Sequence, residues 1–174
     1  MSPQTFAWRR IWHLGDDVNT DALAPGAYMQ HGIDVIAKHC LESSVPAFAH
    51  DVRAGDVIVA GSNFGIGSSR EQAASALVHL GVAAVIAPSY GGLYFRNAFN
   101  LGLLLLTCPI VERLHSQSEL AIDTTTLSIH LRDGDVVTCE PIPDFLLKLA
   151  HSGGLLPSLK LQMASSPLPP KPAI

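Results

Sequence analysis

The chain has 174 residues, of which 48% are hydrophobic and 15% charged, and its formal net charge at pH 7 is −4. This length suits one domain with a sizeable core, and the negative charge offers no basic surface for nucleic acid or an anionic membrane. The most apolar run, residues 101–111, is too short to cross a bilayer, and the first twelve residues lack a signal-peptide pattern, so we expect a cytoplasmic protein.

Strands and helices are predicted to alternate through the middle of the chain. Short apolar runs that indicate buried strands occur at residues 56–61, 82–88 and 103–107. Segments with helical spacing separate these runs at residues 69–80 and 92–100. Because the two kinds of element alternate, we expect an α/β fold with a parallel or mixed sheet and helices packed on its faces.

The last third of the chain has a different pattern. Residues 127–140 alternate apolar and polar side chains on both sides of Asp133-Gly134, which predicts a β-hairpin. Residues 143–154 are predicted to form a last helix, with proline at its start and glycines at its end. Residues 165–174 are proline-rich and have no periodicity, which is typical of a disordered tail. We therefore expect one domain over residues 1–164.

The three cysteines, Cys40, Cys108 and Cys139, are widely spaced and contain no C-x-x-C pair. This pattern supports neither a disulfide framework nor a zinc or iron–sulfur site built from cysteine. We expect each cysteine to fill apolar space in the core. Any metal that the protein uses would have to be bound by another chain.

A glycine-rich segment at residues 61–71 connects the first buried strand to the next helix and reads GSNFGIGSSRE. Its spacing matches neither a P-loop nor a dinucleotide-binding motif, and it lacks the G-x-S-x-G pattern of a hydrolase nucleophile. A glycine-rich turn into a helix nevertheless presents backbone N–H groups at the positive end of the helix dipole. Such a turn suits an anion, and a carboxylate fits as well as a phosphate.

Two interpretations of this segment remain open from the residues alone. Ser68 and Glu71 have the spacing of a capping box, in which Ser68 caps the helix and Glu71 reaches back to it. Arg70 favours a ligand instead, because a cation in the first helical turn opposes the helix dipole at a cost of about 0.3 kcal/mol or more. An anion bound in front of that turn would remove the conflict.

Four stretches, at residues 11–29, 54–65, 61–71 and 84–109, resemble the mobile domain of the aconitase superfamily. Within that superfamily, the small subunits of 3-isopropylmalate dehydratases are the most similar. The resemblance covers roughly residues 9–160. It implies an α/β fold, a single swivelling β/β/α-type domain with a mixed, partly parallel sheet flanked by helices.

The resemblance also implies an activity. Members of this family are hydro-lyases that interconvert the 2- and 3-hydroxy isomers of an alkylmalate, here most simply 3-isopropylmalate and 2-isopropylmalate in leucine biosynthesis. They act only with a large subunit, as a heterodimer or heterotetramer, and that subunit carries a [4Fe–4S] cluster. The metal takes the leaving hydroxyl as a Lewis acid. This chain would then bind no cofactor of its own, no nucleic acid and no membrane.

The family motif, carried onto this sequence, assigns the catalytic base to Ser68. It places Ser69 and Arg70 on a substrate carboxylate, where an arginine can make two parallel hydrogen bonds. Arg70 and the loop N–H groups would also stabilise a developing alkoxide. Thr20 and Asp21 form the matching Thr-Asp pair and are expected to line the same site, and an ordinary Asx turn is the alternative for Asp21.

The sequence departs from the family pattern at Ile66, where cysteine is common, and at Gln72, where histidine is common. Gln30 stands where relatives that bind an extra carboxylate have arginine, which favours a dicarboxylic substrate, since a buried unpaired carboxylate costs several kcal/mol. A protonated His31 would allow a third carboxylate again. The alternatives are therefore a homoaconitate-type or other alkylmalate-type small subunit, and a non-catalytic module that binds an anion or a partner.

Overall fold

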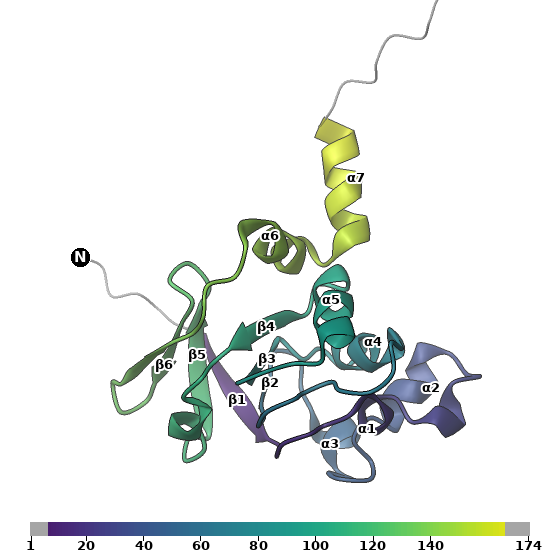
Figure 1. The fold of residues 1–174 in the computed structure, drawn as a ribbon, viewed down its shortest axis with the longest axis horizontal. Helices are drawn as coiled ribbons and strands as arrows, with labels where there is room; N and C mark the ends of the chain where they lie inside the picture. Colours follow the sequence, from purple (N-terminus) through teal and green to yellow (C-terminus); the bar gives the residue numbers. More distant parts are fainter. Residues whose placement is uncertain (1–6, 166–174) are drawn as a thin grey trace, which may run out of the picture.

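The structure is a computed structural model that describes residues 7–165, and these residues build one seven-stranded sheet with helices around it (Figure 1). The strands are β1 Trp8–His13, β2 Val57–Val59, β3 Ala84–Ala87, β4 Leu104–Thr107, β5 Glu119–Asp123, β6 Ser128–Leu131 and β7 Val136–Thr138. Their order across the sheet is β4-β3-β2-β1-β5-β6-β7. Strands β1 to β4 pair in parallel, and β1, β5, β6 and β7 pair antiparallel. The predicted mixed, partly parallel sheet is confirmed.

The parallel half forms the centre of the core. Val57 lies opposite Ile11 on one side and Ala84 on the other, and Ala84 lies opposite Leu104. Every residue of β2 and β3 is buried. Strands covered on both faces show continuous apolar runs instead of alternation, which is why the sequence of this region reads as it does.

The antiparallel half contains the predicted hairpin. Strands β6 and β7 flank Asp133-Gly134, and the Leu131 N–H donates to the Asp135 carbonyl at 2.9 Å to close the turn. On β7 only the middle residue, Val137, is buried. This alternation of burial is expected for a strand with one face toward solvent.

Helices and 3₁₀ turns fill the connections. They are α1 Thr20–Leu23, α2 Ile33–Lys38, α3 Phe48–Asp51, α4 Gln72–His79, α5 Gly92–Asn100, α6 Asp144–Ser152 and α7 Leu155–Ser165, with 3₁₀ turns η1 Gly26–Tyr28 and η2 Val111–Leu114. Helices α1, α2 and α5 contact α4, and α5 contacts β4, so these helices form a connected layer beside the parallel strands. In the part of the chain that the structure describes, no helix is long and apolar enough to cross a membrane.

The prediction for the carboxyl-terminal end is wrong in one respect. Residues 143–154 do contain a helix, α6, but it is not the last one, because α7 follows directly after Gly153 and Gly154. Helix α7 projects from the body (Figure 1) and leaves Leu156 and Met163 exposed. Of the predicted tail, Ser165 ends α7 and residues 166–174 lie outside the described residues.

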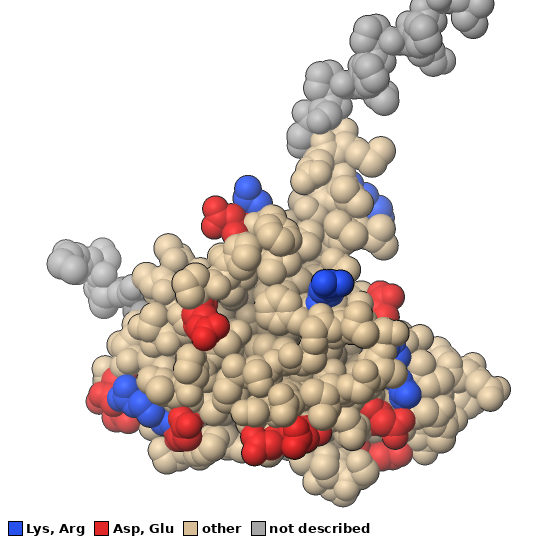
Figure 2. Space-filling view, viewed as in Figure 1, with Lys and Arg blue, Asp and Glu red and all other residues tan. Residues whose placement is uncertain are grey.

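Charged side chains of both signs are scattered over the face seen in Figure 2, and no broad basic patch occurs on it. Helix α7 carries few of them, so most of its visible surface is uncharged. This view agrees with the net charge of −4. Nothing on this face has the electrostatic footprint of a nucleic-acid-binding protein.

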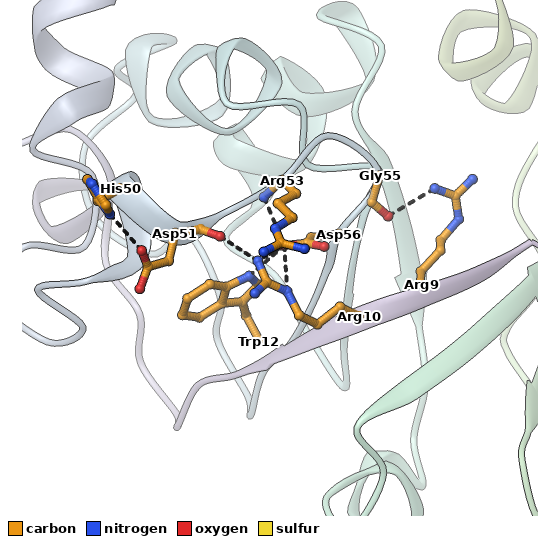
Figure 3. A network of polar contacts seen from close by, with 8 residues as sticks. All are labelled: Arg9, Arg10, Trp12, His50, Asp51, Arg53, Gly55 and Asp56. Carbon is orange, nitrogen blue, oxygen red and sulfur yellow. Dashed lines mark hydrogen bonds and ion pairs between the residues drawn. The ribbon is translucent and has the colours of Figure 1, made fainter.

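A buried carboxylate joins β1 to the start of β2 (Figure 3). One oxygen of Asp56 accepts hydrogen bonds from Nε and Nη2 of Arg10, Nε1 of Trp12 and the backbone N–H of Arg53, at 2.5–3.1 Å. The Asp56 side chain is 7% exposed. Burial alone would raise the pKa of Asp56, but the hydrogen bonds from Arg10, Arg53 and Trp12 hold it below its ordinary value.

Candidate functional site

The glycine-rich loop at residues 61–71 follows the carboxyl end of β2 and continues the pairing of the sheet. On the β1 side, the Gly65 N–H donates to the Val18 carbonyl at 2.7 Å, and the Thr20 N–H donates to the Ile66 carbonyl at 2.8 Å. These bonds extend the β1–β2 pairing beyond the ends of both strands. They bring the Thr20-Asp21 pair directly beside the loop.

The opposite side of the loop is held in the same way. The Phe64 N–H donates to the Ser89 carbonyl at 3.0 Å, and the Gly91 N–H donates to the Phe64 carbonyl at 2.9 Å. The segment after β3 thus pairs with the loop as β3 pairs with β2. Backbone contacts therefore fix the loop on both sides, independently of its side chains.

Two of the loop glycines are required by close contacts. Gly65 has φ +76°, and a Cβ there would lie 2.2 Å from the ring of Tyr94. Gly67 has φ +117°, and a Cβ there would lie 2.9 Å from Oγ1 of Thr20. Both conformations are unfavourable for other residues. The glycines thus allow the loop to pack against α5 and α1.

Four of the residues predicted for the site form one hydrogen-bonded network. Ser68 Oγ accepts from Nε of Arg70 at 2.7 Å and lies 3.2 Å from Oγ1 of Thr20. Thr20 Oγ1 also accepts the backbone N–H of Ser68 at 3.0 Å. Nη1 of Arg70 donates to Asp21 Oδ1 at 2.9 Å and to the carbonyl of Ala24 at 2.8 Å. Residues nearly 50 positions apart in sequence are therefore in direct contact.

The charges of this network are arranged around Arg70, whose side chain is 23% exposed. The hydrogen bond from Arg70, and then the one from the Gly26 N–H at 3.0 Å, lower the pKa of Asp21, so its carboxylate is ionised at neutral pH. The Gly26 contact spans five residues and is not the two-residue Asx turn considered above. The hydrogen bonds of Arg70 to other described residues use Nε and Nη1, and none of them uses Nη2.

The capping-box interpretation is wrong. Helix α4 begins at Gln72, its N-cap is Glu71, and Glu71 makes no side-chain capping hydrogen bond. Ser68 lies three residues before this N-cap, and its hydroxyl and N–H contact Arg70 and Thr20 instead of the helix. The predicted helix over 69–80 therefore starts later than expected, and Arg70 lies directly before the N-cap instead of in the first turn.

Two other predicted site residues lie outside the network. The Ser69 side chain is exposed, and its carbonyl accepts from Nδ2 of Asn97 on α5 at 3.0 Å. Gln30 is exposed in the turn after η1, and no hydrogen bond described for residues 7–165 joins it to the loop. Asn97 was not identified from the sequence, because only the fold shows which side of α5 faces the loop.

A groove of about 440 Å³ lies between α2 and α4, next to the end of the loop. Its lining residues are His31, Ile33, Ile36, Glu71, Gln72, Ser75, Val78, His79 and Leu101. Ser68 and Arg70 are not among them, so their network lies on the surface outside the groove. Ser68 is exposed, so the proposed base is open to an approaching molecule.

The described residues contain no group of three or more histidine, cysteine or acidic side chains placed to hold a metal ion. The three cysteines are buried, as predicted. Burial raises the pKa of the Cys40 thiol to about 12, which keeps it protonated at neutral pH. These side chains do not fit a metal cluster on this chain.

Comparisons with known proteins agree on one protein family for this chain. A family model described as the aconitase C-terminal domain matches residues 27–110. The chain is 42% identical over 149 residues to a 3-isopropylmalate dehydratase small subunit of Methanosarcina acetivorans, with 84% of this chain and 92% of that protein covered. It is also 42% identical over 149 residues to a methanogen homoaconitase small subunit of Methanothermobacter thermautotrophicus, with 84% of this chain and 86% of that protein covered. A crystal structure of 3-isopropylmalate dehydratase from Methanocaldococcus jannaschii is similar with a TM-score of 0.82 and 34% identity, over 92% of this chain and 96% of that one.

Proposed function

Since the chain belongs to the 3-isopropylmalate dehydratase small-subunit family of the aconitase superfamily, we propose that it is the small subunit of a hydro-lyase that isomerises an alkylmalate. The reaction would dehydrate 3-isopropylmalate and rehydrate the product to 2-isopropylmalate, a step of leucine biosynthesis. The proposed location of the protein is the cytoplasm. The observation that carries this proposal is the contact of Ser68 Oγ with Arg70 Nε at 2.7 Å on an exposed, rigidly held loop.

Ser68 is the proposed base. The proton to be removed lies on a carbon next to a carboxylate, and a serine oxygen removes it efficiently only when its negative charge is stabilised. Arg70 supplies a positive charge and a hydrogen bond directly to that oxygen. Asp21 holds Nη1 of the same guanidinium, so the orientation of Arg70 does not depend on the substrate. The remaining Nη2 is proposed to bind a substrate carboxylate.

A large subunit is proposed to cover this surface, in a heterodimer or heterotetramer. Ser68 is exposed in the chain alone, whereas charge stabilisation of this kind is strong only where water is excluded. A [4Fe–4S] cluster on the large subunit would supply Lewis-acid chemistry for the departing hydroxyl. This chain would contribute the base and the carboxylate-binding loop.

The proposed substrate is a dicarboxylic alkylmalate that binds at Arg70. Thr20 and Asp21 would support this site through their contacts with Ser68 and Arg70, and Ser69 and Gln30, which lie outside that network, are proposed as further substrate contacts. Gln30 is neutral, so it offers no charge to a third carboxylate. The similarity to a homoaconitase small subunit keeps a tricarboxylic substrate as the alternative. The two possibilities differ by one charge, which makes them easy to separate in competition assays with alkyl- and carboxyalkyl-substituted maleates.

The test is to purify the full chain anaerobically with the subunit that accompanies it and to measure hydration of an alkylmaleate. Ser68→Ala is expected to abolish turnover while leaving assembly intact, because it removes only the proposed base. Ser116→Ala, a change of the same size at an exposed position after η2, is the matched control and is expected to keep full activity. Wild-type turnover in the Ser68→Ala complex would refute the assignment of the base.

A further inference from the structure

Thr20 is the one buried side chain in the Ser68 network, at 2% exposure. It is the first residue of α1, but the capping of that helix is done by Asn19, whose Oδ1 accepts the Ala22 N–H at 2.9 Å. The hydroxyl of Thr20 is therefore not needed by its own helix. It points across to the glycine-rich loop instead.

The Thr20 hydroxyl makes two contacts with the same residue. Its oxygen accepts the Ser68 N–H at 3.0 Å, and the two hydroxyl oxygens lie 3.2 Å apart. The approach is possible only because Gly67 has no Cβ, since a Cβ there would lie 2.9 Å from Thr20 Oγ1. The loop is thus shaped to receive this hydroxyl.

The direction of the hydrogen bond follows from the chemistry of the base. A threonine hydroxyl has one donor and two acceptor positions, and one acceptor position of Thr20 is already used by the Ser68 N–H. When Ser68 is deprotonated it can only accept, so Thr20 must then donate. Arg70 Nε donates to the same oxygen. The alkoxide would therefore receive two preorganised hydrogen bonds, one charged and one neutral.

We propose that Thr20 is a positioning residue for the reaction: it holds the Ser68 peptide in place and donates a hydrogen bond to the Ser68 oxygen when that oxygen carries the negative charge. This inference rests on the proposed function. Because Thr20 is buried and contacts Ser68, its contribution to the substrate site is made through the base.

The test uses three variants of the full chain in complex with the large subunit. Thr20→Ser keeps the hydroxyl and loses only the methyl group. Thr20→Ala loses both groups, so it differs from Thr20→Ser in the hydroxyl alone. Thr20→Val removes the hydroxyl and preserves the side-chain shape. The Ala and Val variants are expected to lose about 100-fold in kcat, as for loss of one donor to an oxyanion, with KM nearly unchanged. The Ser variant is expected to keep most of the wild-type kcat.

The pH dependence of kcat separates this role from a structural one. Loss of the Thr20 donor should move the ascending limb to higher pH in the Ala and Val variants, because the Ser68 alkoxide is less stabilised. The Ser variant should keep the wild-type profile. Thr125→Val, at an exposed turn position, is the control for the substitution itself. If Thr20→Val does not assemble, the Ser and Ala pair decides the question.

The outcomes distinguish the two levels of the argument. Suppose that the wild type is active, that Ser68→Ala is inactive, and that all Thr20 variants share one kcat and one pH profile. This result would overturn the role of Thr20 and leave the proposed function in place. Absence of hydratase activity in the wild-type complex would overturn the proposed function together with this role.

Discussion

Replacement of Asp56 by asparagine is expected to destabilise the chain more than any single loss of a surface ion pair. The Asp56 carboxylate oxygen accepts four hydrogen bonds from Arg10, Trp12 and Arg53 (Figure 3), and its side chain is 7% exposed. Hydrogen bonds to a charged group contribute about 1.5–3 kcal/mol each. Asparagine keeps one acceptor but loses the charge, and Arg10 is partly exposed, so we expect a loss of about 2–4 kcal/mol in the free energy of unfolding.

Urea unfolding of the purified chain at pH 7 measures this loss by linear extrapolation. The effect should depend on pH. Because the pKa of Asp56 is lowered in the folded state, its stabilisation is present above the unfolded pKa and is lost as pH falls through the folded pKa. The difference between wild type and variant should therefore shrink below about pH 4, the ordinary pKa of aspartate.

The exposed ion pair of Glu119 with Arg132, at 2.7 Å, provides the control. Glu119→Gln removes a carboxylate from a surface pair and is expected to cost less than about 1 kcal/mol. If Asp56→Asn costs no more than this control, or if its cost is the same well below pH 4 as at pH 7, the assignment of a buried, charge-assisted network at Asp56 is refuted.

Three further changes test the site and its support. Gly67→Ala should lower kcat and cost about 1–3 kcal/mol of stability, since a Cβ at φ +117° would also contact Thr20; thermal unfolding and turnover of the complex check this, and an unchanged Tm would contradict it. Tyr94→Phe should leave Tm unchanged or raise it, because the buried Tyr94 hydroxyl has no hydrogen-bond partner among the described residues; a drop in Tm would show that the hydroxyl is satisfied. Asp21→Asn should raise KM more than it lowers kcat, because the contact that orients Nη1 of Arg70 keeps an acceptor but loses its negative charge; steady-state kinetics of the complex decide, and an unchanged KM would exclude this role.

Much of the fold could be predicted because continuous apolar runs in the sequence indicate the buried parallel strands. Strands β2, β3 and β4 all fall within their predicted segments, and α5 has the predicted bounds. The start of α4 was misplaced because a local signal, the S-x-x-E pattern at Ser68, competed with tertiary contacts that sequence alone does not reveal. Helix α7 was missed because its apolar residues show no single face, so its sequence lacks the periodicity that identifies an amphipathic helix.

The sequence indicated candidate site residues but not their contacts. The structure joins four of the six in one hydrogen-bonded network and leaves Ser69 and Gln30 outside it. The glycines and the Ser-Ser-Arg run identified the loop, and the Thr-Asp pair was expected beside it. Nothing local to residues 19–24 indicates that the Thr20 hydroxyl serves Ser68, because that contact exists only through the parallel pairing of β1 with β2. For the same reason the exposed position of Gln30, away from the network, could not be anticipated.

The backbone bonding of the glycine-rich loop has a consequence for subunit association. Protein complexes whose binding loops are flexible lose conformational entropy when those loops become ordered at the interface. Here the amides of Phe64 and Gly65 are already bonded to the segments after β3 and β1. Hydrogen exchange at these amides should therefore be as slow as in the strands that they extend, since exchange requires the parallel half of the sheet to open. If the proposed function holds, the part of the loop at residues 64–66 would already be ordered before the large subunit binds, and would add no loop-ordering cost to that association.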